Sequence, residues 1–323
     1  MSASIGLGPV LDQLSVRSRE RGSDVQGAIM TLVVFFEDAA IGELARDRIR
    51  MLAAKHPSRV IVLDGTQGPD AARVEADDWI ELGARGCSAD TLRSAIAALR
   101  LPEAPLVLLW IAPGIGNDPR FATLSEQVQT VVYNSSLVDS GHAALCELVD
   151  YVEHHPQLPL ADIAYLRLAP WQESVAIFFD GKDIGELFDL RRVEIACGSE
   201  PEGFYLLGWL ASRLQWRPCS ERSLLTRRGD EIEFEIRREG EPRRISCVAL
   251  SSSHSKFVAE VDKQAETIQL SVTGSSQHPR RYRAISNPGI AALLERAILW
   301  GQNDRIFHDS LNAAGEILAR GKV

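Results

Sequence analysis

The stretch AIMTLVVFFEDAAIGELARDRIRMLAAKHPSRVIVLD, residues 28–64, indicates how the first half of the chain folds. Residues 28–36 are almost entirely apolar, which predicts a buried strand, and residues 59–63 predict a second one. A segment with helical period lies between them, and its apolar residues on one face are Ile41, Leu44, Ala45, Ile49 and Leu52. A strand–helix–strand order of this kind is typical of a parallel sheet.

The same alternation of strands and helices continues to about residue 155. Its predicted elements are strands at 79–82, 106–111 and 128–133, and a helix at 88–99 with Ser88 as its N-cap. Strands that alternate with helices form a mainly parallel sheet covered on both faces. We therefore expect a Rossmann-like, three-layer α/β domain at residues 27–155, preceded by an N-terminal arm at residues 1–26.

A change of pattern marks a second domain. The segment HPQLP, residues 155–159, is a natural connector, because two prolines so close together cannot continue the preceding helix. Residues 231–237, EIEFEIR, alternate apolar and charged side chains, which predicts a half-exposed antiparallel strand. We expect an α+β domain with an antiparallel sheet at residues 160–323. Its predicted helices are one from Pro170 to Phe179, a buried one at 204–216 in which Gly208 permits close packing, and two that end at Trp300 and Arg320.

The composition argues against several classes of partner. The net charge is −9, and an acidic protein repels phosphate backbones, so we expect no nucleic-acid partner. The longest apolar runs, residues 28–36 and 106–112, are shorter than the ~20 residues that a membrane helix needs. Residues 1–21 lack the features of a signal peptide, so we expect a cytoplasmic protein with no membrane partner. The sequence leaves self-association open.

Motifs for catalysis, cofactors and metals are missing from the sequence. Glu37 and Asp38 follow the first predicted strand, where a dinucleotide pyrophosphate would need glycines. The turn PGIGN at 113–117 lacks both the third glycine of the dinucleotide pattern and the Gly-Lys-Ser/Thr of a phosphate-binding loop. No nucleophilic serine elbow occurs, and the five cysteines stand 22 or more residues apart, unlike zinc ligands. We therefore expect a protein that is not an enzyme, with no cofactor and no metal site.

The segment ADIAYLRLAPWQESVAIFFD, residues 161–180, carries a family resemblance. It is similar to the recurring segment of the glucose-6-phosphate dehydrogenase assembly (OpcA) family, which has Trp-Thr-Arg-Leu, then Pro-Trp-Arg-Glu, then Phe-Asp. Further similar stretches, in the family's order, are residues 30–34, 56–62, Trp110, 206–216 and 304–311. Together these stretches cover most of the chain.

The resemblance implies a function without chemistry. A member of this family would bind glucose-6-phosphate dehydrogenase, promote its active oligomer and act as an allosteric activator in the oxidative pentose phosphate pathway. Two alternatives stay open. One is a sugar-phosphate or nucleotide-binding α/β enzyme that uses the turn at 113–117, and the other is a scaffold for another metabolic enzyme. Departures from the family pattern, such as Gln172 in place of the usual arginine, motivate the scaffold hypothesis.

The same resemblance supplies candidate site residues. Those for partner contact or for the family motif are Arg167, Trp171, Gln172, Glu173, His56, Ser58 and Arg59. Trp171 lies on an apolar helix face, which favours a place in the core, and the polar candidates are equally suited to capping or ion pairing within the chain. Some cyanobacterial relatives are thought to respond to redox state through cysteines, which makes Cys87 and Cys219 the redox candidates.

Overall fold

The chain folds into two compact units, which are described separately. The computed structural model describes residues 5–21, 28–75, 78–137, 142–180, 184–240, 244–262, 264, 267–274, 278–284, 289–300 and 304–320. The first unit consists of residues 1–138, 150–163 and 289–303, and the second consists of residues 139–149, 164–288 and 304–323. The domain ranges expected from the sequence stay a prediction, and a helix, α1 (Gly8–Arg21), occupies most of the described part of the expected arm.

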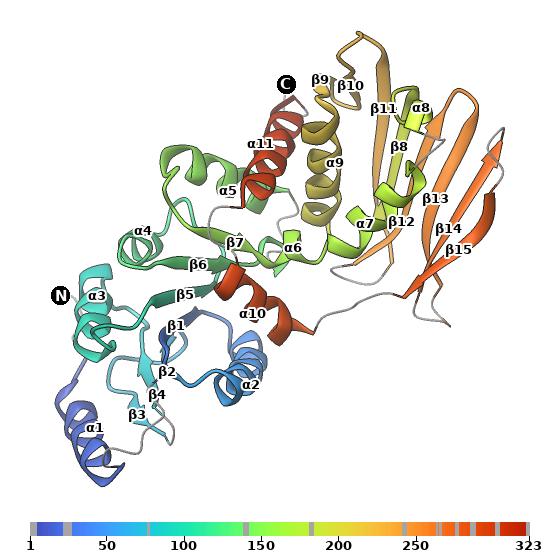
Figure 1. The fold of residues 1–323 in the computed structure, drawn as a ribbon. Coiled ribbons are helices and arrows are strands. Elements are labelled where there is room, and N and C mark those ends of the chain that lie inside the picture. Colours follow the sequence, from blue (N-terminus) through green and yellow to red (C-terminus); the bar gives the residue numbers. More distant parts are fainter. Residues whose placement is uncertain are drawn as a thin grey trace. The chain divides into compact units, whose positions relative to one another are not determined.

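The first unit contains a seven-stranded sheet in the order β3-β4-β2-β1-β5-β6-β7 (Figure 1). Its strands are β1 (Met30–Phe36), β2 (Ser58–Asp64), β3 (Ala72–Val74), β4 (Trp79–Gly83), β5 (Leu106–Ile111), β6 (Thr130–Tyr133) and β7 (Leu160–Asp162). All neighbours pair in parallel except β3 with β4. Every residue of β1 is buried, as expected for a strand covered on both faces. The predicted mainly parallel sheet is confirmed.

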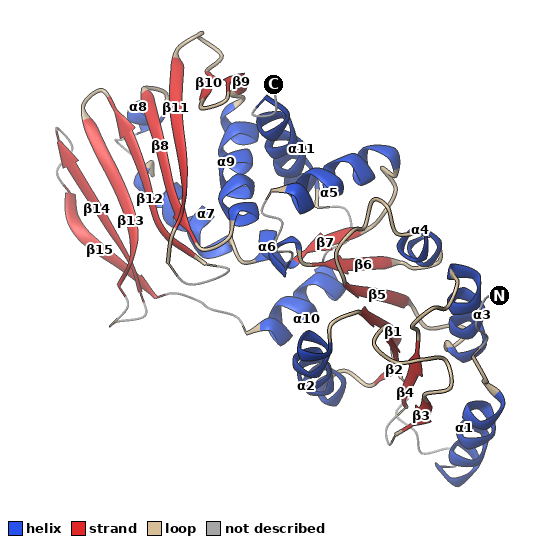
Figure 2. Ribbon diagram, turned by 180° about the vertical axis from the view of Figure 1, so that it is seen from behind, coloured by secondary structure: helices blue, strands red, loops and turns tan. Residues whose placement is uncertain are grey.

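Helices cover both faces of this sheet. The helices with residues in the first unit, besides α1, are α2 (Ala39–Lys55), α3 (Ala89–Leu99), α4 (Pro119–Ser125), the 3₁₀ turn η2 (Ser135–Leu137) and α10 (Ile290–Trp300), while α5 (Ala143–His154) and α6 (Ile163–Leu166) contain residues of both units. Figures 1 and 2 show α2 and α10 on one face, and α3 and α4 on the other. The hydroxyl of Ser88 accepts a hydrogen bond from the Thr91 amide, so Ser88 is the N-cap of α3.

The apolar face of α2 read from the sequence is confirmed at Ile49 and Leu52, which are buried, and is wrong at Leu44. Leu44, assigned there to the apolar face, is 63% exposed, and Met51 is also exposed. Arg46 is buried instead. The reason is electrostatic, because two buried carboxylates on the neighbouring strands bind the Arg46 guanidinium.

The second unit contains an eight-stranded sheet in the order β15-β14-β13-β12-β8-β11-β10-β9. Its strands are β8 (Leu190–Cys197), β9 (Arg217–Ser220), β10 (Ser223–Leu225), β11 (Glu231–Arg238), β12 (Ile245–Ser252), β13 (Ser255–Asp262), β14 (Thr267–Gly274) and β15 (His278–Ala284). Neighbours pair antiparallel except β8 with β11, which are parallel. The predicted antiparallel sheet is confirmed, with this one exception among the described strands.

Helices pack on one face of the second sheet. They include α7 (Ala169–Phe178), α8 (Ile184–Leu187), α9 (Glu200–Leu214) and α11 (Arg305–Arg320). The ring of Phe257 on β13 lies 5.6 Å from that of Phe178 and 4.9 Å from that of Phe179. Gly208 lets α9 approach α11 closely, because a Cβ at this position would lie 2.3 Å from the Ser310 carbonyl oxygen.

None of the helices in the described part of the chain combines the length and the apolar character needed to cross a lipid bilayer.

Candidate functional site

The carboxyl edge of the first sheet is the place where a fold of this kind offers a ligand site. The chain leaves β1 and β5 in opposite directions, and doubly wound sheets bind their ligands at such a switch point. Glu37 and Asp38 follow β1 directly. A carboxylate oxygen of Asp38 accepts a hydrogen bond of 2.8 Å from the amide of Ile41, so the chain caps its own helix α2. The amide groups that would hold a pyrophosphate therefore face a carboxylate of the protein.

An arginine joins the two sides of the switch point. The Arg120 guanidinium lies 2.8 Å from Glu37, also bonds Asp118, and sits 4.8 Å above the centre of the Phe35 ring. The hydrogen bond with Asp118 is the main cause that raises the pKa of Arg120 above its ordinary value. This cation neutralises carboxylates of the protein, which leaves it poorly placed to neutralise an incoming phosphate.

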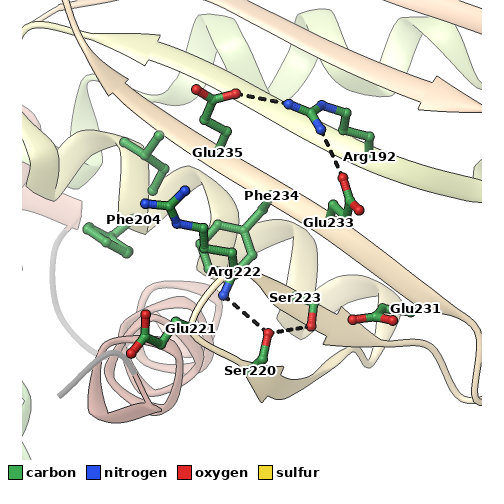
Figure 3. A pocket seen from close by; sticks show the side chains of 11 residues that line it. Arg192, Phe204, Ser220, Glu221, Arg222, Ser223, Glu231, Glu233, Phe234 and Glu235 are labelled. Carbon is green, nitrogen blue, oxygen red and sulfur yellow. Dashed lines mark hydrogen bonds and ion pairs between the residues drawn. The ribbon is translucent and has the colours of Figure 1, made fainter. Parts of the chain in front are cut away.

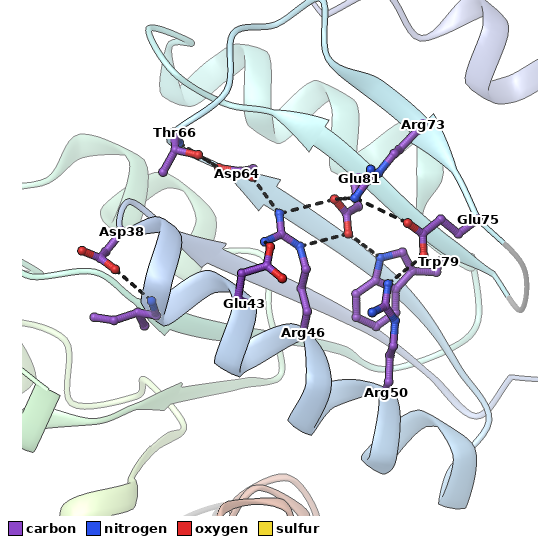
Figure 4. A network of polar contacts seen from close by, with 11 residues as sticks. Asp38, Glu43, Arg46, Arg50, Asp64, Thr66, Arg73, Glu75, Trp79 and Glu81 are labelled. Atoms are coloured by element: carbon purple, nitrogen blue, oxygen red, sulfur yellow. Dashed lines mark hydrogen bonds and ion pairs between the residues drawn. The ribbon is translucent and has the colours of Figure 1, made fainter.

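A buried charge network lies beside the switch point (Figure 4). The Arg46 guanidinium donates to Asp64 at 2.7 Å and to Glu81 at 3.1 Å, and its side chain is 9% exposed. Trp79 and Arg73 also donate to Glu81, at 2.8 and 2.7 Å. Burial alone would raise the pKa of Glu81, but the hydrogen bonds from Trp79 and Arg46 outweigh it, so the pKa is lowered.

Asp64 lies where nucleotide-binding folds place a ribose-binding acid. It ends β2, and an acidic residue near the end of the second strand binds the ribose in dinucleotide-binding domains. Here one of its oxygens binds the Arg46 guanidinium, while the other accepts hydrogen bonds from the amide and hydroxyl of Thr66. Contacts within the chain thus engage both oxygens of this carboxylate.

The turn at 113–117 has a structural role in the described chain. Gly114 has a φ of +78°, which favours glycine, and its carbonyl accepts the amides of Asn117 and Asp118. Asp118 then caps α4 through the Arg120 amide. The second helix that begins at this edge is therefore also capped by an aspartate of the chain.

The family-like segment lies in the second unit, around α7. Arg167 donates a 2.9 Å hydrogen bond to Glu202 of α9, whose side chain is only 1% exposed. Trp171 is 6% exposed and belongs to the core. Gln172 is half-buried and hydrogen-bonds with the hydroxyl of Tyr165. Glu173 is exposed. Of these four candidates, Glu173 is the most exposed, while Arg167 and Gln172 are half-buried.

Tyr165 anchors an aromatic cluster below that segment. Its ring lies 5.5 Å from the Tyr205 ring and 5.1 Å from the Phe307 ring. Burial raises the pKa of Tyr165, partly offset by the hydrogen bonds with Gln172 and Ser310. Tyr165 and Phe307 therefore pack against each other in the core of the second unit.

The remaining interface candidates lie in the first unit and bind other parts of it. His56 Nε2 lies 3.0 Å from a carboxylate oxygen of Glu295 on α10, and the Ser58 hydroxyl donates to the His56 carbonyl. Arg59 donates to the Leu99 carbonyl at 2.9 Å and to Asp78 at 3.3 Å. The candidates from the sequence thus divide into two groups, one in each unit.

The two redox candidates have opposite environments. Cys87 is buried, and desolvation raises the pKa of its thiol, which disfavours the reactive thiolate. Cys219 is exposed on the edge strand β9. Both are free thiols, and no group of side chains in the described ranges is arranged to hold a metal ion.

A cavity in the second unit was not expected from the sequence (Figure 3). Its volume is about 570 Å³. It is lined by Arg192, Phe204, Ser220, Glu221, Arg222, Ser223, Glu231, Glu233, Phe234, Glu235 and Ile236. Four carboxylates and two guanidinium groups give it a negative balance. The signal in the sequence was the alternation of glutamates along β11, which by itself indicates only a strand with one solvated face.

Comparison with known proteins decides the family. Residues 49–150 match the family model for the glucose-6-phosphate dehydrogenase subunit N-terminal domain, and residues 158–311 match that for its C-terminal domain. The chain belongs to the OpcA family. The OpcA protein of Nostoc punctiforme is 30% identical over 189 residues, which are 52% of this chain and 40% of that protein. The OpcA protein of Synechocystis sp. is 28% identical over 191 residues, 52% of this chain and 39% of that protein. The matched region thus spans about two-fifths of each relative's length.

Solved structures with a similar fold are oxidoreductases. GenD2 from gentamicin A biosynthesis, in complex with NAD, has a TM-score of 0.53 at 12% identity, covering 93% of this OpcA-family chain and 95% of its own. An NAD-binding oxidoreductase from Klebsiella pneumoniae has a TM-score of 0.52 at 10% identity, covering 92% and 97%. Identities this low establish a shared fold and no shared activity.

Proposed function

We propose that this chain is a non-catalytic assembly factor that binds glucose-6-phosphate dehydrogenase and promotes its active oligomer. Both family models are named for a subunit of that enzyme, and the curated relatives carry the name OpcA. The proposed setting is the oxidative pentose phosphate pathway in the cytoplasm.

One observation carries the non-catalytic part of the proposal. At the carboxyl edge of the first sheet, Asp38 caps α2, Glu37 binds Arg120, and Asp64 binds Arg46. A dinucleotide would have to displace these contacts and approach several carboxylates. The fold of a nucleotide-binding oxidoreductase is therefore used here without its usual phosphate site.

Activation without chemistry follows from linkage. A partner that binds the active oligomer more tightly than the inactive form shifts the population towards the active oligomer by that difference in affinity. Each tenfold difference contributes about 1.4 kcal/mol, so a modest preference is sufficient to change the enzyme's activity.

The family-motif residues have two proposed roles in this interaction. Glu173 is exposed, so we assign it to direct contact with the enzyme, with Arg167 beside it at 21% exposure. Trp171 and Gln172 then support the surface from below. His56 joins the end of α2 to α10, Ser58 bonds the His56 carbonyl, and Arg59 joins β2 to the end of α3, which makes the three supporting residues of the first unit.

We propose that any redox control of the enzyme complex acts through Cys219. Cys219 is exposed, whereas burial raises the pKa of the Cys87 thiol. Alkylation of the native protein followed by peptide mass spectrometry should label Cys219 well before Cys87. Faster labelling of Cys87 would contradict this assignment.

The deciding experiment titrates the chain into glucose-6-phosphate dehydrogenase from the same organism. We expect a lower half-saturation for glucose 6-phosphate or a higher maximum rate, together with co-elution in size-exclusion chromatography. Glu173→Arg should weaken the complex, while Glu316→Arg, an exposed change on α11, is the matched control.

Two outcomes would overturn the proposal. The first is unchanged activity and elution in both reduced and oxidised samples. The second is tight NADP binding or sugar-phosphate oxidation by the chain alone, which would favour an enzyme. An unaltered complex with Glu173→Arg would move the contact to another surface of the chain.

A further inference from the structure

The strand β11 has neighbours of unequal length on its two sides. On one side, β8 pairs with residues 233–238, up to the end of β11. On the other side, β10 pairs with residues 231–233, and one more hydrogen bond follows, of 2.9 Å from the Phe234 amide to the Arg222 carbonyl. Figure 2 shows β9 and β10 beside one end of β11 only. Among the described strands, none continues that row along residues 235–238, which we call the open edge.

The main-chain groups of the open edge that point away from β8 belong to Ile236 and Arg238. Successive residues of a strand direct their N–H and C=O groups to opposite sides. The Phe234 amide points towards β10, as its hydrogen bond shows, and the Glu239 amide points the other way, to the Cys197 carbonyl of β8. Ile236 and Arg238 have the same parity as Phe234. Their two amide groups and two carbonyl groups therefore face the side without a neighbouring strand, where they can pair with a further one.

The side chains of the open edge alternate between the two faces of the sheet. Ile236 projects to the face covered by helices, because a Cβ on Gly203 of α9 would lie 2.8 Å from the Ile236 Cγ2 atom. Arg238 shares that face, and Glu235 and Arg237 project to the other. A strand placed alongside therefore meets, from Glu235 onwards, one acidic, one apolar and two basic side chains.

The charged side chains of the open edge are accessible to a partner. Arg237 and Arg238 are exposed and form no salt bridge within the described ranges of the chain. Glu235 is bonded to Arg192 at 3.0 Å, but its side chain is still 41% exposed. A carboxylate has lone pairs for more than one donor, so Glu235 can accept a second cation.

The cavity described above lies beside the open edge (Figure 3). Phe204, Phe234 and Ile236 form its apolar part, and Glu235 belongs to the same lining. Its volume of about 570 Å³ is within the range of ordinary ligand pockets. A strand added next to Ile236 would place an apolar side chain against the apolar part of this cavity.

We propose that the open edge binds an extended segment of another protein, which adds to the sheet as an antiparallel strand. Main-chain hydrogen bonds to Ile236 and Arg238 give such a contact its affinity, and the side chains opposite the edge give it specificity. Antiparallel pairing continues the direction of β10 and is slightly more stable per residue than parallel pairing. In its own chain direction, the segment has two acidic residues opposite Arg238 and Arg237, then an apolar residue opposite Ile236 and a basic residue opposite Glu235.

The same charges make a second copy of this chain a poor occupant. Two open edges can pair antiparallel about Ile236, Arg237 or Arg238. A pairing about Arg237 or Arg238 sets that arginine opposite its own copy, which is repulsive. A pairing about Ile236 sets Arg238 of one copy opposite Phe234 of the other, where Arg222 already lies. The open edge is therefore suited to a different chain.

This inference goes beyond the proposed function and does not rest on it. The segment is defined by its sequence pattern, and the test uses the purified chain and synthetic peptides. A chain that activates glucose-6-phosphate dehydrogenase but binds no peptide at the open edge supports only the proposed function. A chain that binds the peptide there without activating the enzyme supports only this inference.

Amide hydrogen exchange of the free chain, resolved by residue, tests whether the edge is open. The amides of Ile236 and Arg238 should exchange at least about tenfold faster than those of Arg237 and Glu239, which point to β8. Equal protection of the two pairs would show that another part of the chain covers the edge, which overturns the proposal.

The binding test uses a fluorescently labelled peptide, Thr-Glu-Glu-Val-Lys-Thr, and its charge-reversed counterpart, Thr-Lys-Lys-Val-Glu-Thr. We expect saturable binding of the first peptide, at least about tenfold tighter than that of the second, and slower exchange of the Ile236 and Arg238 amides in the complex. Because the chain as a whole is acidic, non-specific attraction would favour the second peptide instead. No saturation below about 1 mM, or equal affinity for the two peptides, overturns the proposal.

Two substitutions at one position separate main-chain pairing from side-chain contact. Arg238→Pro removes an amide donor on the open side and spares the ladder with β8, so it should weaken binding of the first peptide about tenfold. Arg238→Ala removes the same charge but keeps that amide, and should weaken binding less than about threefold. If Arg238→Pro fails to fold, as judged by its unfolding transition, the first peptide methylated on its valine nitrogen replaces it, since that nitrogen faces Ile236. Undiminished binding of the peptide by Arg238→Pro, or of the methylated peptide by the wild type, means that the contact does not use the main chain and overturns the proposal.

Discussion

In each of the two units an arginine binds two carboxylates of the sheet, but one of these arginines is buried and the other is exposed to water. In the first unit, Arg46 lies between Asp64 and Glu81, and its side chain is 9% exposed. In the second unit, Arg192 lies between Glu233 and Glu235, and its side chain is 42% exposed. Arg46 bridges carboxylates of two neighbouring strands, β2 and β4, whereas both carboxylates bound by Arg192 belong to β11. They differ in how much water reaches the pair.

In the first unit the buried pairs occupy the position of a ligand site. In the second unit the exposed pairs remain accessible to solvent. The buried network of Arg46 takes up polar groups that the fold otherwise turns towards a ligand. The pairs around Arg192 stay in contact with water and take up no site on the second sheet. The comparison can be tested by removing charges one at a time and ranking the losses in the free energy of unfolding.

The largest loss is expected for Arg46→Ala. This change leaves the buried Asp64 without a cation and Glu81 with Arg73 as its only one, and breaking a buried pair typically costs about 3–5 kcal/mol. Urea unfolding of the purified chain measures the loss. The control is Arg50→Ala on the same helix, whose side chain is 47% exposed and which should lose less than about 1 kcal/mol. Equal losses for both variants would show that burial of an arginine does not decide how much its ion pairs contribute to stability.

A smaller loss is expected for Arg167→Ala in the second unit. Glu202 is 1% exposed and would lose its charged partner, at a cost of about 1–3 kcal/mol. Arg167→Lys should recover part of it, since a cation remains. Glu173→Ala, on the exposed side of the same segment, is the control for unfolding measurements. If Glu173→Ala lowers the free energy of unfolding as much as Arg167→Ala does, the loss does not come from the Arg167–Glu202 pair.

The acid sensitivity of the first unit sharpens the same contrast. The pKa of Glu81 is lowered in the folded protein, so its contribution to stability is present above its unfolded pKa of about 4.3 and is lost as the pH falls through the folded value. The free energy of unfolding, measured from neutral to acid pH, should therefore fall less steeply below that pH in Glu81→Gln than in the wild type. Parallel profiles would show that Glu81 does not contribute.

The smallest loss is expected for Arg192→Ala in the second unit. Pairs exposed to this extent contribute about 0–1 kcal/mol. A loss as large as that of Arg46→Ala would mean that the Arg192 pairs are less solvated than their exposure indicates. Thermal unfolding in low and high salt checks the electrostatic origin of whatever loss is found.

Local patterns were sufficient to predict most strands of the first sheet. Residues 106–111 were predicted as a strand and form β5, and residues 59–63 fall within β2. Such strands are buried on both faces, so each appears as a continuous apolar run with little ambiguity. Ser88 was predicted as an N-cap for a similar reason, since capping depends on the nearest few residues.

The sequence was less informative wherever a distant contact decides the outcome. The periodicity of α2 placed Leu44 on the apolar face, yet the distant carboxylates of Asp64 and Glu81 bring Arg46 inside instead. The short strand β7 was missed because its three residues pair with β6, which no local pattern reveals. The cavity depends on strand order, so single-strand patterns did not predict it either.

The membership of α10 in the first unit has a consequence for how the protein is made. Lys55 of α2 and Glu295 of α10 are bonded although 240 residues separate them. During synthesis from the N-terminus, α2 cannot contact α10 until most of the second unit has left the ribosome. Contacts so far apart in sequence slow folding and leave apolar surface open in the meantime. A nascent chain that stops before residue 289 should therefore need a chaperone, while its second sheet is already largely synthesised.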